Sequence, residues 1–380
     1  MVEIVEKSRC TGCSACAAAC PCNAISLQAG AMGALYPAID PSRCIDCARC
    51  QRVCPALNPS PEQRPQEVWA AKNPDLEVRL KSSSGGLFTP LAEAVIRRGG
   101  VVCGAAYDGD FEVEHRLVER LEELPSLRSS KYQQSRMGNC FSKIEQLLKA
   151  GREVLFSGTP CQSAGLKRYL QRDYEGLLTV DIVCHGAPVP AVWPAYLKMI
   201  NPSGLAITRV DMRNKRSGWN RNRLRIESEE GLLLDERASH NLYLQGFLKD
   251  LYLRPSCHRC PAKGCGGLSD ITLGDYWGIN HHHPTFADPK RGVSLVLIHT
   301  AKGKAAFEAI SAERISSTWE QAIERNPALV TSPHEPEAAK EFCRRFEEEG
   351  AESAFQLLGG NCRPHPAKRL LEKLKHLLGI

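Results

Sequence analysis

One cysteine motif, which occurs twice near the start of the chain, constrains the fold more than any other feature. In each copy, two residues separate each of three cysteines from the next, and a fourth cysteine follows after three further residues with a proline directly behind it. A loop of this spacing presents three thiolates to one [4Fe–4S] cluster, whereas the fourth thiolate binds the other cluster. The spacing predicts that Cys10, Cys13, Cys16 and Cys54 bind one cluster, and that Cys44, Cys47, Cys50 and Cys20 bind the second.

Zinc and disulfides explain this repeat less well. Structural zinc usually takes paired Cys-x2-Cys arms without a third cysteine two residues further on, and disulfides would not repeat such a motif. Residues 1–57 resemble the bacterial two-cluster ferredoxin domain, which implies a carrier of single electrons. Cys22 fits no ligand position, so we expect a small buried thiol there.

Length and charge set further bounds. A chain of 380 residues exceeds the usual size of one core, so two or three domains are expected. No run of about 18 apolar residues and no signal sequence are visible, which predicts a cytoplasmic protein without a transmembrane segment. The formal charge of +6 falls towards zero if three clusters are bound, because each oxidised cluster with its thiolates carries about −2. We therefore expect no nucleic-acid partner.

A proline-rich stretch divides the chain. We expect a ferredoxin domain at 1–57, a linker at 58–67, a larger domain at 68–350 and a C-terminal helical segment at 351–380. The predicted fold class is mixed α/β: a small ferredoxin domain, then a larger mixed-sheet domain and a helical end. Hydrophobic patterns predict helices at 87–98, 139–150, 337–349, 352–358 and 366–378, and strands at 101–107, 153–157, 177–183, 271–273 and 293–299. The last helix is basic and amphipathic, and we expect it to dock on its own domain, with a membrane surface or a partner as the alternatives.

The larger region carries a second set of cysteines. Cys161 and Cys184 each follow a predicted strand, and the carboxyl ends of strands are where open α/β sheets place their ligand sites. Cys257 and Cys260 form a Cys-x2-Cys clip, with Cys265 five residues beyond Cys260. These residues are candidates for a third [4Fe–4S] cluster, although zinc at the clip and Cys265 is an alternative. We expect inert buried residues at Cys103, Cys140, Cys343 and Cys362.

Seven segments of the larger region occur in the order found in a known family. They are residues 81–89, 130–135, 156–162, 183–188, 257–264, 269–278 and 292–303. Together they resemble the beta subunit of coenzyme F420 hydrogenase/dehydrogenase over roughly residues 67–350. This resemblance implies a flavin-binding iron–sulfur oxidoreductase, with FAD favoured over FMN. It also implies that the cluster next to the flavin binds Cys161, Cys184, Cys257 and Cys260, which leaves Cys265 spare.

Several residues are candidates for holding the flavin. Residues 82–86 (Ser-Ser-Ser-Gly-Gly) precede a predicted helix, where small residues let backbone N–H groups approach an anion. A serine N-cap followed by a glycine turn is the alternative. Lys131 is a candidate contact to the flavin phosphate or ring, or else a surface lysine. The full candidate set is Ser82, Ser83, Ser84, Gly85, Gly86, Lys131, Thr159 and Gln162.

Three other patterns carry weaker predictions. We expect structural roles for Asp270 and Asp275, because hydride exchange with a flavin needs no dedicated carboxylate. The basic stretch 213–219 is either a site for an acidic substrate or redox partner, or a solvated loop. The three histidines at 281–283 are expected in a solvent-facing loop, because consecutive residues rarely converge on one ion. No residue is assigned a catalytic role.

The expected function follows from joining a flavin to clusters. A flavin exchanges a hydride or two electrons, whereas a cubane accepts one electron at a time. The sequence therefore predicts an oxidoreductase that links two-electron chemistry to one-electron transfer. Its expected partners are a one-electron redox protein or ferredoxin, a deazaflavin or another two-electron substrate, and a larger redox complex. The alternative is a relay subunit whose substrate site lies on another chain.

Overall fold

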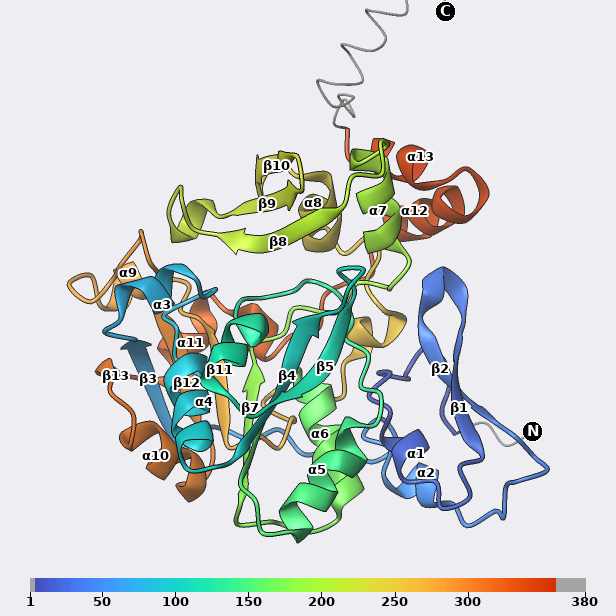
Figure 1. The fold of residues 1–380 in the computed structure, drawn as a ribbon, viewed down its shortest axis with the longest axis horizontal. Helices are drawn as coiled ribbons and strands as arrows, with labels where there is room; N and C mark the ends of the chain where they lie inside the picture. Colours follow the sequence, from blue (N-terminus) through green and yellow to red (C-terminus); the bar gives the residue numbers. More distant parts are fainter. Residues whose placement is uncertain (1–3, 360–380) are drawn as a thin grey trace, which may run out of the picture.

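The computed structural model describes residues 4–359, so the predicted helix 366–378 and Cys362 lie outside the described part. Figure 1 shows three groups of elements: a small N-terminal unit, a large sheet flanked by helices, and a smaller sheet with helices above the large one. The predicted mixed α/β fold class is confirmed. Within the described residues, no helix is long and apolar enough to cross a membrane.

The two cysteine motifs of the N-terminal unit have the same backbone conformation. Helices α1 (Ala15–Ala18) and α2 (Arg49–Arg52) follow the two cysteine motifs, and strands β1 (Ile25–Ala29) and β2 (Leu35–Ile39) pair antiparallel. A short 3-10 turn, η1 (Ala31–Gly33), joins the strands. The residues on either side of the second cysteine adopt positive φ in both motifs. These are Gly12 (69°) and Ser14 (67°) in the first motif, and Asp46 (52°) and Ala48 (54°) in the second.

The large sheet has eight strands in the order β13-β3-β12-β11-β7-β6-β4-β5. Their bounds are β3 (Glu67–Lys72), β4 (Val101–Tyr107), β5 (Val113–Val118), β6 (Val154–Gly158), β7 (Leu177–Ile182), β11 (Ile271–Asp275), β12 (Ser294–Ile298) and β13 (Glu313–Ser317). The central strands β4, β6, β7 and β11 run parallel, so their carboxyl ends meet at one edge. All five predicted strands are present, shifted by at most two residues at an end. The predictions missed β3, β5 and β13.

Helices cover both faces of this sheet (Figure 1). They are α3 (Leu76–Leu80), α4 (Phe88–Arg97), α5 (Cys140–Lys149), α6 (Pro160–Leu170), α9 (Ile279–His282), α10 (Ala301–Glu308) and α11 (Trp319–Glu324), with 3-10 turns η2 (Leu121–Leu127) and η5 (Pro327–Leu329). The apolar side of α4 packs against β4, β6 and β7 in one core cluster. The other face of β6 packs against α5 and α6, where Phe141, Phe156 and Leu166 are buried. Helices α4 and α5 confirm two of the predicted helices.

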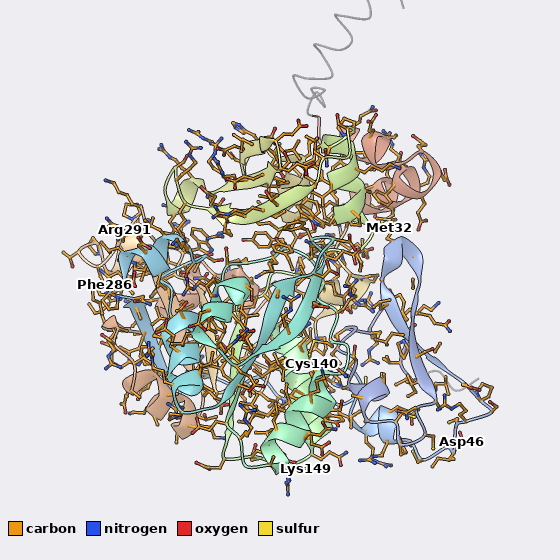
Figure 2. All side chains as sticks on the ribbon, in the orientation of Figure 1. Met32, Asp46, Cys140, Lys149, Phe286 and Arg291 are labelled. Atoms are coloured by element: carbon orange, nitrogen blue, oxygen red, sulfur yellow. The ribbon has the colours of Figure 1, made fainter. Side chains whose placement is uncertain are left out.

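The smaller sheet consists of β8 (Ile207–Asn214), β9 (Arg223–Ser228) and β10 (Gly231–Arg237), all antiparallel. It packs with α7 (Val192–Ile200), α8 (Leu242–Leu248), α12 (Glu337–Glu348) and α13 (Ala351–Gln356) around an aromatic core that includes Trp193, Tyr243 and Phe355. Helices α12 and α13 correspond to the predictions at 337–349 and 352–358. Two further turns, η3 (Trp219–Arg221) and η4 (Pro255–Arg259), complete the described elements. Figure 2 shows the side chains that fill the space between these layers.

Candidate metal centres

The first set of ferredoxin-type cysteines gathers in one apolar pocket. Cys10, Cys13, Cys16 and Cys54, which the crossing rule assigns to one cluster, line it together with Ile4, Val5, Leu27 and Pro37. Burial raises the pKa of Cys13 to about 11, and the neighbouring Cys54 and Cys10 add to the rise. Four thiols crowded in this way lose their protons only if nearby cations compensate the negative charge, which iron ions would do. The donor set therefore fits a [4Fe–4S] cluster.

The second set lies closer to the surface. Cys20, Cys44, Cys47 and Cys50 are all partly exposed. Burial raises the pKa of Cys50, and the charges of Cys47 and Cys20 contribute. The Ala24 N–H donates to the Cys20 sulfur at 3.3 Å. Cys22 is partly exposed rather than buried as expected, because it lies in the surface turn that leads into β1.

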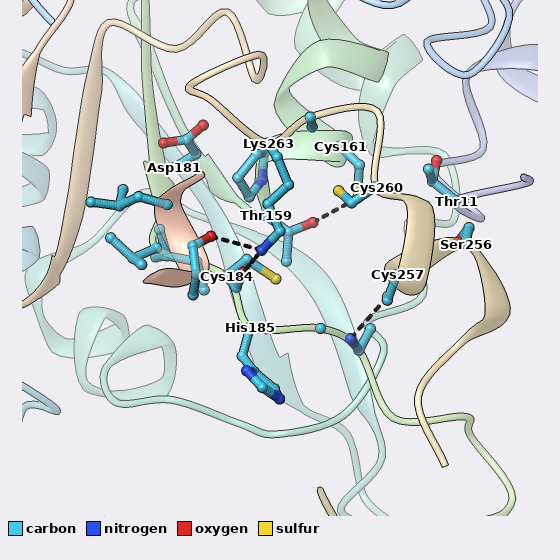
Figure 3. Close-up of a pocket in the computed structure, with 18 of the residues that line it drawn as sticks. Thr11, Thr159, Cys161, Asp181, Cys184, His185, Ser256, Cys257, Cys260 and Lys263 are labelled. Atoms are coloured by element: carbon cyan, nitrogen blue, oxygen red, sulfur yellow. Dashed lines mark hydrogen bonds between the residues drawn. The ribbon is translucent and has the colours of Figure 1, made fainter. Parts of the chain in front are cut away.

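Four cysteines of the larger region converge on another pocket (Figure 3). Cys161 lies in the first turn of α6 and Cys184 two residues beyond β7, so both lie at the carboxyl edge of the parallel strands. Cys257 lies within η4 and Cys260 directly follows it. Cys265 also lines this pocket, but its thiol pKa is raised by burial and then by Asp181 and Glu62 rather than by the other cysteines. The geometry thus brings the four predicted ligands together and sets Cys265 apart electrostatically.

The surroundings of these four sulfurs suit a cluster. Burial raises the pKa of Cys184 to about 12 and that of Cys257 to about 11, while the Lys263 ammonium lowers both. Lys263 is held beside them because its Nζ donates to the Cys184 and Ala328 carbonyls, each at 2.7 Å. The Ala187 N–H donates to the Cys257 sulfur at 3.3 Å. Hydrogen bonds to sulfur and a nearby cation are the means by which proteins tune such clusters.

Within residues 4–359, no three His, Cys, Asp or Glu side chains lie close enough to share a single metal ion. A zinc site requires such closeness, because all of its ligands lie about 2.3 Å or less from one ion. A cubane does not require it, since each thiolate binds a different iron. The convergence of cysteines on this pocket is compatible with a cluster, in which each thiolate binds its own iron.

The pocket of the first cysteine set adjoins the pocket lined by the candidate ligands of the third cluster. Thr11 lines both pockets. Gly165 of α6 lies against Cys13, so closely that a Cβ at Gly165 would stand 3.0 Å from the Cys13 sulfur. Arg254, which is 1% exposed, donates to the Cys10 carbonyl at 2.7 Å and to the Leu35 carbonyl at 2.6 Å. This buried guanidinium fastens the N-terminal unit to the segment that carries Cys257.

The candidate flavin residues 82–86 pack across the carboxyl edge of the sheet. Ser84 Oγ donates to the Val293 carbonyl at 2.8 Å, and the Gly85 N–H donates to Ser294 Oγ at 2.9 Å. Ser83 Oγ lies 2.8 Å from Ser130 Oγ, which connects this loop to the segment of Lys131. The alternative of a serine N-cap is wrong, because the N-cap of α4 is Leu87, without a side-chain cap.

Two basic residues of the stretch 213–219 hold this loop in place. Arg213 is 6% exposed and Lys215 is 4% exposed, so these two cations are neither solvated nor free to bind an anion, whereas Arg216 is exposed and pairs with Asp235. Lys215 Nζ donates to the carbonyls of Arg79 at 2.9 Å, Ser84 at 2.5 Å and Arg291 at 2.6 Å. Arg213 donates to the Ser83 carbonyl at 3.1 Å and pairs with Asp275 at 2.9 Å. The expected structural role of Asp275 agrees with this pairing.

The remaining candidate flavin contacts are engaged within the protein. Lys131 donates to the Arg128 carbonyl at 3.0 Å, and burial lowers its pKa to about 7. Gln162 Oε1 accepts from the Thr159 N–H at 2.9 Å, which completes the capping box of α6. Within the described residues, the serine loop (residues 82–86) forms its hydrogen bonds with other segments, and none of these bonds involves Thr159 or Gln162. The candidate set thus forms two groups, one at each side of the carboxyl edge.

Other predicted and missed residues complete the site. Asp270 is buried and accepts from the Thr179 hydroxyl at 2.7 Å, in line with a structural role. Of the three histidines, only His281 is exposed, because 281–282 belong to α9 and His282 pairs with Glu324. Lys263 and Arg254 were missed. The position of Lys263, three residues after Cys260, was the available signal, whereas Arg254 has none in the sequence.

Comparisons with known proteins give two family matches and one similar solved structure. Residues 9–58 match the model of the 4Fe-4S dicluster domain, and residues 151–321 match the family described as the C-terminal part of the beta subunit of coenzyme F420 hydrogenase/dehydrogenase. Among solved structures, one chain of the F420-reducing [NiFe] hydrogenase complex from Methanosarcina barkeri, from a study of xenon derivatization, is 16% identical, with a TM-score of 0.47 over 78% of this chain and 92% of that one. A comparison with curated proteins gives no match.

The fold, the arrangement of the cysteines and the two family matches together indicate an iron–sulfur protein that transfers electrons and is related to oxidoreductases. Residues 151–321 thus match the coenzyme F420 hydrogenase/dehydrogenase beta-subunit family model, and the 4Fe–4S dicluster match precedes them at 9–58. The predicted family resemblance is confirmed.

Proposed function

We propose that this chain is a flavin-dependent oxidoreductase that interconverts two-electron transfer at FAD with one-electron transfer through three [4Fe–4S] clusters. The observation that supports it is the convergence of Cys161, Cys184, Cys257 and Cys260 on one pocket, next to the pocket that contains Cys13. Such a series of sites suits a relay of single electrons.

Each part of the chain then has a role. Cys161, Cys184, Cys257 and Cys260 would hold the third cluster, with Lys263 compensating its negative charge. The serine loop 82–86, kept in shape by Lys215, would hold the flavin, which supplies exchange of a hydride or electron pair with a substrate. Lys131, with a pKa lowered to about 7, would offer a proton or a hydrogen bond beside that loop. Arg254 would keep the first cluster against the third.

The proposed substrate and partners follow from the same scheme. The matched family name includes coenzyme F420, so a deazaflavin is the first two-electron substrate to test, followed by NAD(P)H. A ferredoxin or another one-electron protein would be the second reactant, within a larger redox complex or alone. We propose a cytoplasmic location, and no nucleic-acid partner.

Metal and flavin content test this proposal directly. Protein purified anaerobically and reconstituted with FAD should carry about twelve irons per chain and show flavin absorbance. Cys161→Ser should lose about four irons, whereas the matched control Cys343→Ser, a partly buried residue that packs against the aromatic core and does not line the pocket, should lose none. A reconstituted protein without flavin, or an iron content that Cys161→Ser leaves unchanged, would refute the proposal.

A relay subunit without its own substrate site is the second candidate. It is favoured by the internal hydrogen bonds of Thr159, Gln162 and the serine loop, which leave few of these groups free for a flavin. Turnover separates the two candidates. A flavoenzyme reduces one-electron dyes with reduced F420 or NAD(P)H as donor, whereas a relay reduces them only when a one-electron donor is present.

A further inference from the structure

The two ferredoxin-type clusters would occupy unlike surroundings, although their motifs are alike. In the first set, Cys10, Cys13 and Cys54 are 7–8% exposed, and Cys13 lies against α6 of the large domain. Every cysteine of the second set is partly exposed. In Figure 2 Asp46, which lies between Cys44 and Cys47, is at the outer edge of the molecule. The first cluster thus faces inwards to the third, and the second faces solvent.

The loop around the second cluster has the character of a docking surface. We define the 43–52 surface as the exposed side chains of residues 43–52. Ile45, between two predicted ligands, is 65% exposed, the highest fraction among the exposed large hydrophobic side chains of the described residues. Arg43, Arg49 and Arg52 are exposed and form no salt bridge within the described residues. Asp46 is the one carboxylate in this stretch of the sequence.

We propose that the 43–52 surface docks an acidic one-electron carrier protein, which exchanges electrons with the cluster held by Cys20, Cys44, Cys47 and Cys50. This inference rests on the proposed function for electron transfer between the third and first clusters. It adds the surface at which electrons leave the protein and the charge of the partner that receives them. In each encounter one electron moves from the reduced cluster to the oxidised carrier. The cluster is oxidised by one electron, the carrier is reduced by one, and no bond or proton changes.

Charge selects the partner. Three exposed arginines and one carboxylate, Asp46, lie among the partly exposed cysteines of this stretch, so the stretch carries a net positive charge. Opposite charge on the partner raises the encounter rate, and arginine is enriched at protein interfaces. Ile45 supplies an exposed apolar side chain in the same stretch, and protein interfaces typically combine an apolar core with a polar rim. A basic carrier would be repelled by the same three groups.

The test uses the iron-loaded full-length protein and two triple variants of equal charge change. Arg43, Arg49 and Arg52 are changed to Gln in the first. The control changes Arg97, Arg209 and Arg237 to Gln, which are exposed on α4 and the smaller sheet. The chemically reduced protein is mixed with an oxidised acidic plant-type [2Fe–2S] ferredoxin in a stopped-flow instrument at about 50 and 200 mM salt. The dissociation constant is measured separately by calorimetry, so binding is read without electron transfer.

We expect the first variant to react at least about tenfold more slowly at low salt, to bind more weakly and to lose most of its salt dependence. The control variant should match the unmodified protein. Equal rates in all three proteins, or a basic carrier such as cytochrome c reacting faster than the acidic one by binding this loop, would overturn the proposal.

Two precautions keep the result interpretable. Arg43 donates to the Cys22 carbonyl at 2.9 Å, so a double variant of Arg49 and Arg52 alone preserves that contact. Iron content and the electron paramagnetic resonance of the reduced clusters must be equal in all proteins. Because the experiment starts from chemically reduced clusters, it needs neither flavin nor the third cluster. A missing flavin would therefore refute the proposed function and leave this result intact.

Discussion

A methyl group at Gly165 tests how the N-terminal unit is seated on the large domain. In Gly165→Ala the new Cβ would stand 3.0 Å from the sulfur and 3.1 Å from the Cβ of Cys13, well inside ordinary contact distance. Alanine favours a helix over glycine by about 1 kcal/mol, whereas an extra methyl in a filled space costs about 1–3 kcal/mol. Cys13 cannot yield easily if iron fixes its sulfur. We therefore expect a net cost of about 1 kcal/mol, concentrated at this contact.

Hydrogen exchange reads this cost locally. Amides of α1 should exchange about fivefold faster in the iron-loaded Gly165→Ala protein, and faster still in Gly165→Leu. Ser163→Ala in the same helix is the control, because its buried hydroxyl has no hydrogen-bond partner within residues 4–359 and its loss should leave α1 unchanged. If α1 exchanges at the unmodified rate in both Gly165 variants, the close contact between α6 and Cys13 is refuted.

Three further changes test the carboxyl edge and its surroundings. Lys215→Met leaves one buried and two partly buried carbonyls without their donor, so it should lower the free energy of unfolding by about 3 kcal/mol in a denaturant titration; equal stability would show that these hydrogen bonds do not stabilise the fold. Gly85→Ala places a Cβ 2.6 Å from the Ser294 nitrogen, so the loop must move, and the protein should lose FAD while keeping its iron; retained FAD would argue against this loop as the flavin site. Burial lowers the pKa of His115 to about 4, so between pH 7 and 5 only the unfolded chain gains this proton and the contribution of His115 to stability should fall by about 2 kcal/mol; His299, whose pKa burial also lowers to about 4, adds a similar fall, so His115→Gln should make the slope shallower by the His115 share, and an unchanged slope contradicts the assignment.

The sequence predicted the parts of this protein whose information is local. The cysteine spacing paired Cys54 with Cys10, and the structure places both in one pocket because two short loops of the same shape face each other. Strands such as 101–107 were predictable since they are continuous apolar runs buried on both faces. The smaller sheet was missed because its strands carry arginines and carboxylates that pair along the surface, which hides the alternation.

Contacts between distant segments could not be predicted. Lys215 binds carbonyls at positions 79, 84 and 291. Because every residue has a backbone carbonyl, the sequence does not show which of them accept hydrogen bonds from a distant lysine. For that reason 213–219 had the composition of a surface loop although Arg213 and Lys215 are buried. Arg254 is a similar case, because its partner Cys10 lies 244 residues away. Buried cations that bind backbone oxygens are visible only after the chain has folded.

The repeated backbone of the two cysteine loops has a consequence for redox potential. Identical ligands in nearly identical loops would give two clusters the same intrinsic affinity for an electron, so any difference must come from the medium around them. Reduction adds a negative charge, which costs more beside the buried Cys13 than beside the half-exposed Cys47. We expect the inner cluster to have the lower potential and the outer one the higher. With that difference in potential, the duplicated motif, with one copy buried and the other partly exposed, would form a downhill step for electrons from the inner cluster to the outer one.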